Sequence, residues 1–277
     1  MKRKIGSIFF GLMFLAGALA ILYPSVSNWL NQRNATRAVI SYNEKVLEMP
    51  DENNIRMREE AVSHNNLIEQ ENSLSAAVSM EEANKETYEN LLNPLENGMM
   101  GIIKIPKIKV VLPIYHTTEE SVLQSGIGHY IGSSLPVGGP GTHCILSGHR
   151  GLPSAKLFTD IDQMCVGDQF YIDTLGEVMA YQVDEIKVVL PDELDSLNVM
   201  PDQDYVTLVT CTPYGVNTHR MLVRGTRVPY IPEKETIIEP VQSQREHRLF
   251  VISIFAGCCF VIAIVAGNIY GNKKQKK

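Results

Sequence analysis

Two long apolar runs lie near the ends of the chain, and a polar, strand-patterned middle separates them. Residues 5–23 and 249–270 contain no charged side chain. As a helix that rises about 1.5 Å per residue, each run is long enough to cross a hydrocarbon core of about 30 Å. The pattern predicts a transmembrane segment within residues 1–23 and a transmembrane helix over 249–270. Because the first run contains Ala18-Leu19-Ala20, a cleaved signal peptide is the alternative for that segment.

Basic residues flank both apolar runs on their outer sides. Lys2, Arg3 and Lys4 precede the first run, and lysines dominate the tail at 271–277. Lysine and arginine are enriched on the cytoplasmic side of membrane segments. We therefore expect both termini, including the basic tail, in the cytoplasm, and residues 24–248 outside the cell at the membrane surface.

Residues 24–97 follow a helical pattern. Apolar residues recur at helical spacing: Ala35, Ala38, Val39, Tyr42 and Val46. The stretch is also rich in carboxylates: Glu44, Glu48, Glu59, Glu60, Glu69, Glu71, Glu81 and Glu82. We expect these carboxylates to form a solvated face without a catalytic role. The pattern predicts a helical, acidic N-terminal extension over 24–97.

Between residues 98 and 230 the pattern changes to short β-prone runs separated by Gly and Pro turns. The candidate strands are 102–105, 109–114, 142–146, 169–173, 178–189, 205–210 and 221–228. Short strands at this density are typical of a small closed β-barrel or a sandwich, so the domain is expected to be mainly β. A short helix at 154–162 is expected to interrupt the strands, and residues 231–248 are expected to form an extended linker.

Composition limits the partners. The chain of 277 residues is 44% hydrophobic and 20% charged, with a formal net charge of −6. That length accommodates one or two domains. An acidic chain lacks the basic surface that a phosphate backbone requires, which excludes nucleic acid as a partner. No CxxC or HxxxH spacing occurs, so we expect neither a metal site nor a cofactor.

Five cysteines are present, and Cys258 and Cys259 lie in the second apolar run. The others are Cys144, Cys165 and Cys211. An odd number in an exported domain leaves one thiol free unless it pairs between chains. Cys144 and Cys165 could form a disulfide, although each is more typical of a structural residue. A free thiol outside the membrane is a candidate nucleophile.

Cys211 ends a strongly β-prone run, and Thr212-Pro213-Tyr214-Gly215 then breaks the strand. Arg220 begins the next run, so an antiparallel hairpin would place its guanidinium beside the Cys211 sulfur. A guanidinium there can stabilise a thiolate or the oxyanion of a tetrahedral intermediate. Arg224 shares the strand face by period-two alternation and is the alternative. Thr210 is a candidate substrate-binding residue, although it could equally fill the strand.

His149 follows an apolar run and precedes the turn at Arg150-Gly151. A histidine at the junction of a strand and a loop can project into a cleft and serve as general acid or base in acyl transfer. His143 is the nearest alternative, but it lies in the middle of the run. The remaining histidines of the β-rich region are expected to be structural or exposed: His116, His129 and His219.

These segments resemble a known family. Thr207-Leu208-Val209-Thr210-Cys211 matches the TLxTC signature of sortases, and the match continues through Arg220. Three upstream segments resemble the class C, pilin-polymerising branch of that family: Leu112–His116, Leu135–Gly139 and Ser147–Pro153. The resemblance covers roughly residues 98–228. It implies a closed, eight-stranded sortase-type β-barrel with short helices, the helical extension and two flanking transmembrane helices.

The resemblance also implies an activity. Sortases are cysteine transpeptidases that cleave an LPxTG-like sorting signal after its threonine, hold it as a thioacyl-enzyme and transfer it to an amine. It assigns Cys211 as nucleophile, His149 as acid/base and Arg220 as stabiliser of substrate and oxyanion. The implied partners are LPxTG-bearing surface or pilin proteins and an amine acceptor, usually a pilin lysine in class C. An Asp-Pro-aromatic lid motif is absent from residues 24–97, so no Asp-anchored lid is expected.

Three other functions fit parts of the pattern. Attachment of surface proteins to a cell-wall amine would use the same fold and residues. A plain cysteine protease would resolve the thioacyl-enzyme with water, although papain-type enzymes place their cysteine before their histidine, whereas His149 precedes Cys211. A non-enzymatic, membrane-tethered binding domain would not require Cys211, His149 and Arg220 together.

Overall fold

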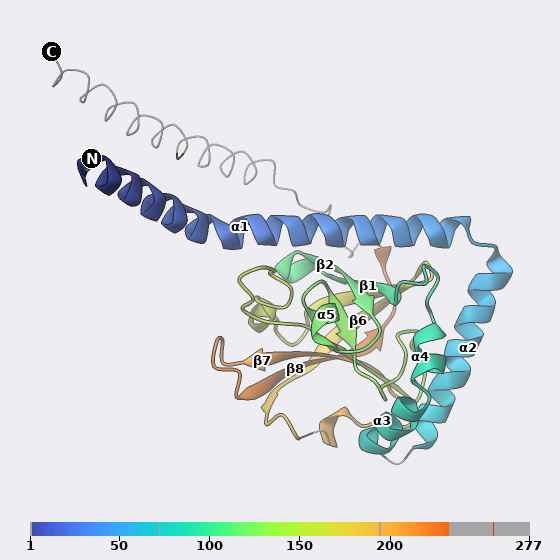
Figure 1. Ribbon diagram of the computed structural model, residues 1–277. Coiled ribbons are helices and arrows are strands. Elements are labelled where there is room, and N and C mark those ends of the chain that lie inside the picture. The colour runs from blue at the N-terminus through green and yellow to red at the C-terminus, as the bar shows by residue number, and fades with distance from the viewer. Residues whose placement is uncertain (1, 72, 194, 233–256, 258–277) are drawn as a thin grey trace. The chain divides into compact units, whose positions relative to one another are not determined.

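The computed structural model describes residues 2–71, 73–193, 195–232 and 257 (Figure 1). Contacts divide the chain into one unit of residues 1–22 and 239–277 and another of residues 23–238. The expected transmembrane helix at 249–270, apart from Gly257, lies outside the described residues, as do the basic tail and most of the linker. Most side chains of the first apolar run also lie outside them. Among the helices described, none is both long and apolar enough to span a membrane.

Four helices precede the strands: α1 (Lys2–Glu48), α2 (Asp51–Gln70), α3 (Leu74–Ala83) and α4 (Lys85–Asn90). The first of them continues from the apolar run at 5–23 into the extension at 24–97. Pro50 lies between α1 and α2, and Asp51 and Glu52 then complement the positive end of the α2 dipole. Ser73 caps α3, because its hydroxyl oxygen accepts a hydrogen bond of 3.3 Å from the Ala76 N–H. These helices account for the helical pattern of the extension.

Eight strands form the barrel: β1 (Met99–Ile105), β2 (Val110–Tyr115), β3 (Ile127–His129), β4 (Thr142–Ser147), β5 (Gln169–Thr174), β6 (Glu177–Val189), β7 (Asp204–Thr212) and β8 (His219–Val228). They are hydrogen-bonded in the order β1-β2-β3-β4-β7-β8-β6-β5, and β5 closes the barrel on β1. The pairs β2–β3 and β4–β7 are parallel, and the others are antiparallel. The predicted closed, mainly β barrel is confirmed.

Short elements connect the strands. They are α5 (Glu120–Leu123) and three 3₁₀ turns, Pro106–Ile108, Ile161–Gln163 and Asp195–Leu197. The helix expected at 154–162 is wrong, since that stretch forms turns that end in the second of these 3₁₀ turns. Its Phe158 donates a backbone hydrogen bond of 3.1 Å to the His149 carbonyl and is fully buried. Packing of this ring against the barrel overrides local helix propensity.

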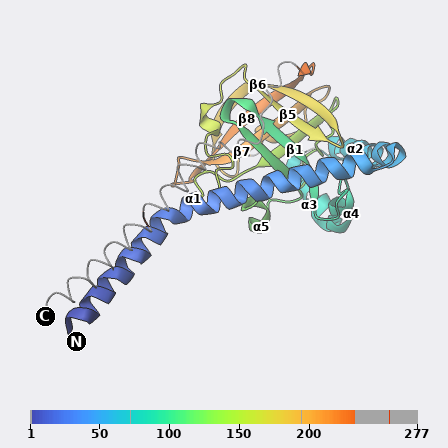
Figure 2. The ribbon, with the colours of Figure 1, turned by 90° about the horizontal axis from the view of Figure 1, so that it is seen from above.

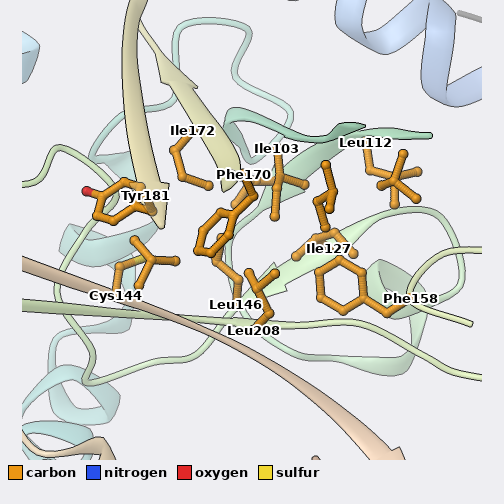
Figure 3. Close-up of a cluster of buried hydrophobic side chains, with 14 of the residues drawn as sticks. Ile103, Leu112, Ile127, Cys144, Leu146, Phe158, Phe170, Ile172, Tyr181 and Leu208 are labelled. Atoms are coloured by element: carbon orange, nitrogen blue, oxygen red, sulfur yellow. The ribbon is translucent and has the colours of Figure 1, made fainter. Parts of the chain in front are cut away.

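Apolar side chains of the strands meet inside the barrel (Figure 3). Phe170 and Ile172 alternate along β5, and both are buried because alternate residues of a strand share one face. Each fully buried side chain of this size contributes about 1.5–3 kcal/mol. Phe158 packs into the same interior beside Ile127, which fixes the loop that follows β4 (Figure 3). The core therefore sets the position of the loop that begins at His149.

The extension packs directly on the barrel. From residue 23 onward α1 runs across the barrel beside β1 (Figure 2), and its Tyr42 is fully buried there. The Tyr42 hydroxyl donates to the Met100 carbonyl at 2.8 Å and accepts from the Leu175 N–H at 3.0 Å. On α2, the buried Asn65 amide bonds both backbone groups of Leu135, at 3.1 and 2.7 Å.

One carboxylate departs from the expected solvated face. Glu81 of α3 is only 1% exposed, and its oxygens contact the His64 imidazole and the Gly132 backbone N–H. A buried carboxylate requires such partners because transfer out of water is costly. Glu81 therefore links the extension to the loop between β3 and β4 rather than facing solvent.

Candidate active site

Cys211 and Arg220 lie opposite each other on neighbouring strands. β7 and β8 pair antiparallel, and their register places Cys211 against Arg220. Directly opposed residues share a face, with Cβ atoms about 4.5–5.5 Å apart. The Arg220 guanidinium donates to the backbone carbonyls of Asn217 and His219, at 3.3 and 3.1 Å. These two carbonyls hold the cation at the mouth of the hairpin, on the same face as the sulfur.

His149 lies at the same edge of the barrel. β4 and β7 run parallel, Ser147 pairs with Val209, and the Gly148 N–H donates to the Val209 carbonyl at 3.0 Å. His149 and Cys211 each come two residues beyond that pair. Because parallel strands end at one edge of a sheet, the two residues lie near each other at that edge.

Gly148 permits this arrangement. A Cβ at this position would lie 2.6 Å from the Phe158 ring and 2.7 Å from the Ile127 side chain. Only glycine fits between the ring and the strand end without displacing one of them. The close approach holds His149 immediately above the packed core.

Of the two roles considered for Thr210, substrate binding and filling the strand, its position fits the second. It is only 2% exposed, and its hydroxyl donates to the Gly148 carbonyl at 2.8 Å. Successive residues of a strand face opposite sides, so Thr210 points away from the face of Cys211. It therefore presents almost no surface to a substrate and instead ties the end of β7 to the end of β4.

His149 has a carboxylate neighbour that the sequence patterns did not indicate. Glu120, the first residue of α5, places a carboxylate oxygen 3.2 Å from His149 Nε2. A hydrogen bond from Gln124 and the nearby His149 lower the pKa of the Glu120 carboxyl. The acidic pair at Glu119-Glu120 was visible in the sequence, but its approach to His149 depends on the connection between β2 and β3.

Arg224 is engaged elsewhere. Its guanidinium contacts Asp184 at 2.8 Å and Glu185 at 3.3 Å, and it stacks 4.4 Å from the centroid of the Tyr205 ring. The hydrogen bonds that Arg224 donates to Asp184 raise the pKa of the guanidinium. Of the two arginines considered for Cys211, the structure therefore favours Arg220.

His143, the nearest alternative to His149, is enclosed. It is 1% exposed, its Nδ1 bonds the Asn198 carbonyl at 3.0 Å, and its Nε2 lies 2.7 Å from the Thr207 hydroxyl. Burial lowers the pKa of His143 to about 4. A neutral ring with both nitrogens occupied has a structural role and cannot exchange protons with a substrate.

The other cysteines differ from Cys211. All three cysteines in the described part of the chain are free thiols, so Cys144 and Cys165 form no disulfide. Cys144 is 3% exposed, and burial raises the pKa of its thiol. Cys165 is exposed, and its sulfur lies 3.8 Å from the Gln163 carbonyl. Cys211 is half-buried beside a cation, which is the environment of a reactive thiol.

The edge thus gathers a thiol, an imidazole and a guanidinium. A thiol can attack a carbonyl carbon, an imidazole can move the protons and a guanidinium can stabilise the oxyanion. Within the residues that the structure describes, no group of three His, Cys, Asp or Glu side chains is arranged to hold a metal ion. The arrangement suits acyl transfer through a thioester.

Comparison with known proteins agrees with this chemistry. Residues 103–228 match the model of the sortase domain family. The chain is 47% identical to sortase C1 from Streptococcus agalactiae, covering 70% of this chain and 100% of that one, with a TM-score of 0.67. For sortase C-1 from Actinomyces oris the identity is 44%, the coverage is 64% and 99%, and the TM-score is 0.59.

Curated relatives are more distant. Sortase D from Bacillus subtilis is 30% identical over 131 residues, which cover 46% of this chain and 63% of the relative. Sortase SrtE1 from Streptomyces coelicolor is also 30% identical, over 49% of this chain and 42% of the relative. The chain therefore spans less than two thirds of the length of these two relatives.

Proposed function

Because this chain belongs to the sortase family of cysteine transpeptidases, and to its class C branch, we propose that it cleaves an LPxTG-like sorting signal and transfers the threonine acyl group to a pilin lysine. One observation carries the proposal: Cys211 pairs with Arg220 at the barrel edge where His149 leaves β4. The similarity to two class C structures supports the choice of a pilin lysine as acceptor.

The first half of the reaction makes the thioester. His149 holds the proton of the Cys211 thiol, and the resulting thiolate attacks the threonine carbonyl carbon. The charge that develops on the carbonyl oxygen faces the Arg220 guanidinium. The C–S bond forms and the Thr–Gly C–N bond breaks. His149 gives its proton to the departing glycine amine, so the fragment leaves as a neutral amine.

The second half consumes the thioester. A neutral lysine amine of the acceptor attacks the same carbonyl carbon, and His149 takes up the proton that this nitrogen loses. The C–S bond breaks, Cys211 is restored, and an isopeptide bond joins two pilin subunits. Attachment to a cell-wall amine would follow the same steps with another acceptor.

We further propose that the enzyme is anchored in the cell membrane with its catalytic barrel outside. The two uncharged runs at 5–23 and 249–270 and their basic outer flanks support this orientation. Such an anchor would place the barrel at the surface where exported proteins leave the membrane.

The test combines a fluorescent LPxTG-type peptide with the full-length chain in detergent micelles and a second peptide that carries one lysine. We expect an isopeptide-linked product by mass spectrometry, and none when the acceptor lysine is replaced by arginine. If only hydrolysed peptide forms at a saturating concentration of the acceptor peptide, the result would favour a cysteine protease. Unchanged peptide in every reaction would favour a binding domain.

A further inference from the structure

The loop that follows His149 is fastened to the end of β7 by a largely buried arginine. Arg150 is the residue after His149, and its side chain is only 10% exposed. Its guanidinium donates to the hydroxyl of Thr212, the residue after Cys211, at 3.4 Å. On its other side it contacts the Asp162 carboxylate, near the far end of the same loop.

An aromatic contact joins the same two segments. The Arg150 guanidinium lies 6.0 Å from the centroid of the Tyr214 ring, in the hairpin loop between β7 and β8. Gly151 has φ +78°, and a Cβ there would lie 2.9 Å from that ring. The backbone at Gly151 therefore packs against Tyr214 in a conformation that glycine adopts without strain.

The surroundings of the Arg150 guanidinium compensate only partly for its loss of water. A buried guanidinium loses its hydration, and Asp162, its only carboxylate partner among the described residues, is 46% exposed and partly screened. The Arg150 Nε–H is buried and has no hydrogen-bond partner in the described part of the chain. A buried donor without a partner costs the folded chain stability.

We propose that Arg150 is a positioning residue, which holds His149 against Cys211 by linking the loop after β4 to the end of β7. The inference rests on the proposed function, because it assigns Arg150 a part in that reaction. Arg150 acts through its neighbours: it precedes the loop turn at Gly151 and bonds the residue that follows the nucleophile. A catalytic pair tolerates little displacement, since an error of about 1 Å can cost ~10²-fold in rate.

The test measures kcat and KM of full-length Arg150→Gln, Arg150→Lys and Thr212→Val in detergent micelles. We expect Arg150→Gln to lower kcat by ~10²-fold with KM within about threefold, because chemistry rather than binding is lost. Arg150→Lys keeps the charge but loses the planar guanidinium and its several N–H donors, so its kcat should lie between those of Arg150→Gln and wild type. Thr212→Val should lower kcat less in the Arg150→Gln background than in the wild-type background, because both substitutions remove the same Arg150–Thr212 hydrogen bond.

Arg58→Gln is the matched control. Arg58 also pairs with a half-exposed carboxylate, Glu177, and donates to the Val137 carbonyl, but it lies on α2. It should lower the melting temperature without lowering kcat. Wild-type kcat in Arg150→Gln would overturn the proposal. The proposal would also be overturned if kcat in Arg150→Gln and Thr212→Val fell only in proportion to the melting temperature, to the same extent as in Arg58→Gln.

A second readout needs no peptide substrate. The rate at which iodoacetamide alkylates Cys211 depends on the thiolate, and hence on a correctly placed His149. We expect Arg150→Gln to slow alkylation at neutral pH, and Arg58→Gln to leave it unchanged. If wild type makes no transpeptidation product but Arg150→Gln still slows alkylation, the proposed function fails and the positioning role stands. Equal alkylation rates in wild type and Arg150→Gln would contradict the positioning role.

Discussion

At the scale of single residues, three thiols of one barrel have three environments. Cys144 is enclosed by the core, Cys165 is exposed beside a turn, and Cys211 lies half-buried opposite a guanidinium. Reactivity requires access together with stabilisation of the thiolate. Only Cys211, among the cysteines described, combines both, and the cation comes from its strand partner.

The two histidines of the β4 region should respond oppositely to removal. His149→Ala should lower kcat by ~10²–10⁴-fold with little change in melting temperature, because a general acid/base is lost from a partly exposed position. His143→Ala should cost about 1–3 kcal/mol of unfolding free energy, because the Asn198 carbonyl and Thr207 hydroxyl lose their partner. Kinetics and urea unfolding of both variants measure this. Loss of activity in a fully folded His143→Ala would contradict the assignment.

Glu120 should hold the His149 ring in place for the reaction. Its carboxylate oxygen lies 3.2 Å from His149 Nε2, and a hydrogen bond from Gln124 together with the nearby His149 lowers the pKa of the Glu120 carboxyl. Glu120→Gln weakens this contact, so kcat should fall with KM nearly unchanged, because the ring is positioned less firmly. Glu119, whose carboxylate pairs with Lys85, provides the control, and Glu119→Gln should leave kcat unchanged. Steady-state kinetics of both variants measure this, and wild-type kcat in Glu120→Gln would contradict the role.

At the scale of elements, the β7–β8 hairpin gives two arginines different surroundings. Arg220 faces Cys211, whereas Arg224 faces Thr207 in the register and pairs with Asp184 and Glu185 of β6. Arg220→Met should lower kcat/KM by ~10²–10³-fold, as expected for a lost oxyanion donor. Arg224→Met should instead cost about 1–2 kcal/mol of stability and keep kcat/KM close to wild type. A large loss of kcat/KM in Arg224→Met with near wild-type kcat/KM in Arg220→Met would contradict this assignment.

Element boundaries show what the sequence can and cannot predict. Long β-prone runs such as 178–189 are recognisable from the sequence alone. The two β-prone runs on either side of the break at 212–215 predict the hairpin that pairs Cys211 with Arg220. β3 escaped prediction because it has only three residues, and its pairing with β2 and β4 comes from distant segments. The expected helix at 154–162 failed because Phe158 is drawn into the core. Contacts far apart in sequence decide such short elements.

At the scale of the molecule, the N-terminal extension and the barrel share buried polar contacts. Asn65 bonds both backbone groups of Leu135, and Glu81 bonds the Gly132 N–H. Sequence patterns predicted the helices correctly but assigned Glu81 to a solvated face. The sequence does not distinguish a buried carboxylate from an exposed one, because its partners come from distant segments. The same holds for Glu120 beside His149.

This docking predicts that the extension and the barrel unfold together. Asn65→Ala should cost about 1–3 kcal/mol, because it leaves the Leu135 N–H and carbonyl without partners. Its exposed neighbour Asn66 is the control, and Asn66→Ala should change stability by less than about 0.5 kcal/mol. Urea unfolding followed by tryptophan fluorescence and circular dichroism measures both. Two separate transitions in the wild type would contradict a shared unit.

The most direct measurement of the central claim is the mass of the enzyme after exposure to an LPxTG-type peptide without an amine acceptor. We predict a covalent adduct equal to the peptide fragment through its threonine, located at Cys211 by proteolysis and released by hydroxylamine as expected of a thioester. The adduct should persist in Cys165→Ala and vanish in Cys211→Ala. An adduct that survives Cys211→Ala, or none on a folded wild-type chain, would contradict the assignment of Cys211 as the nucleophile.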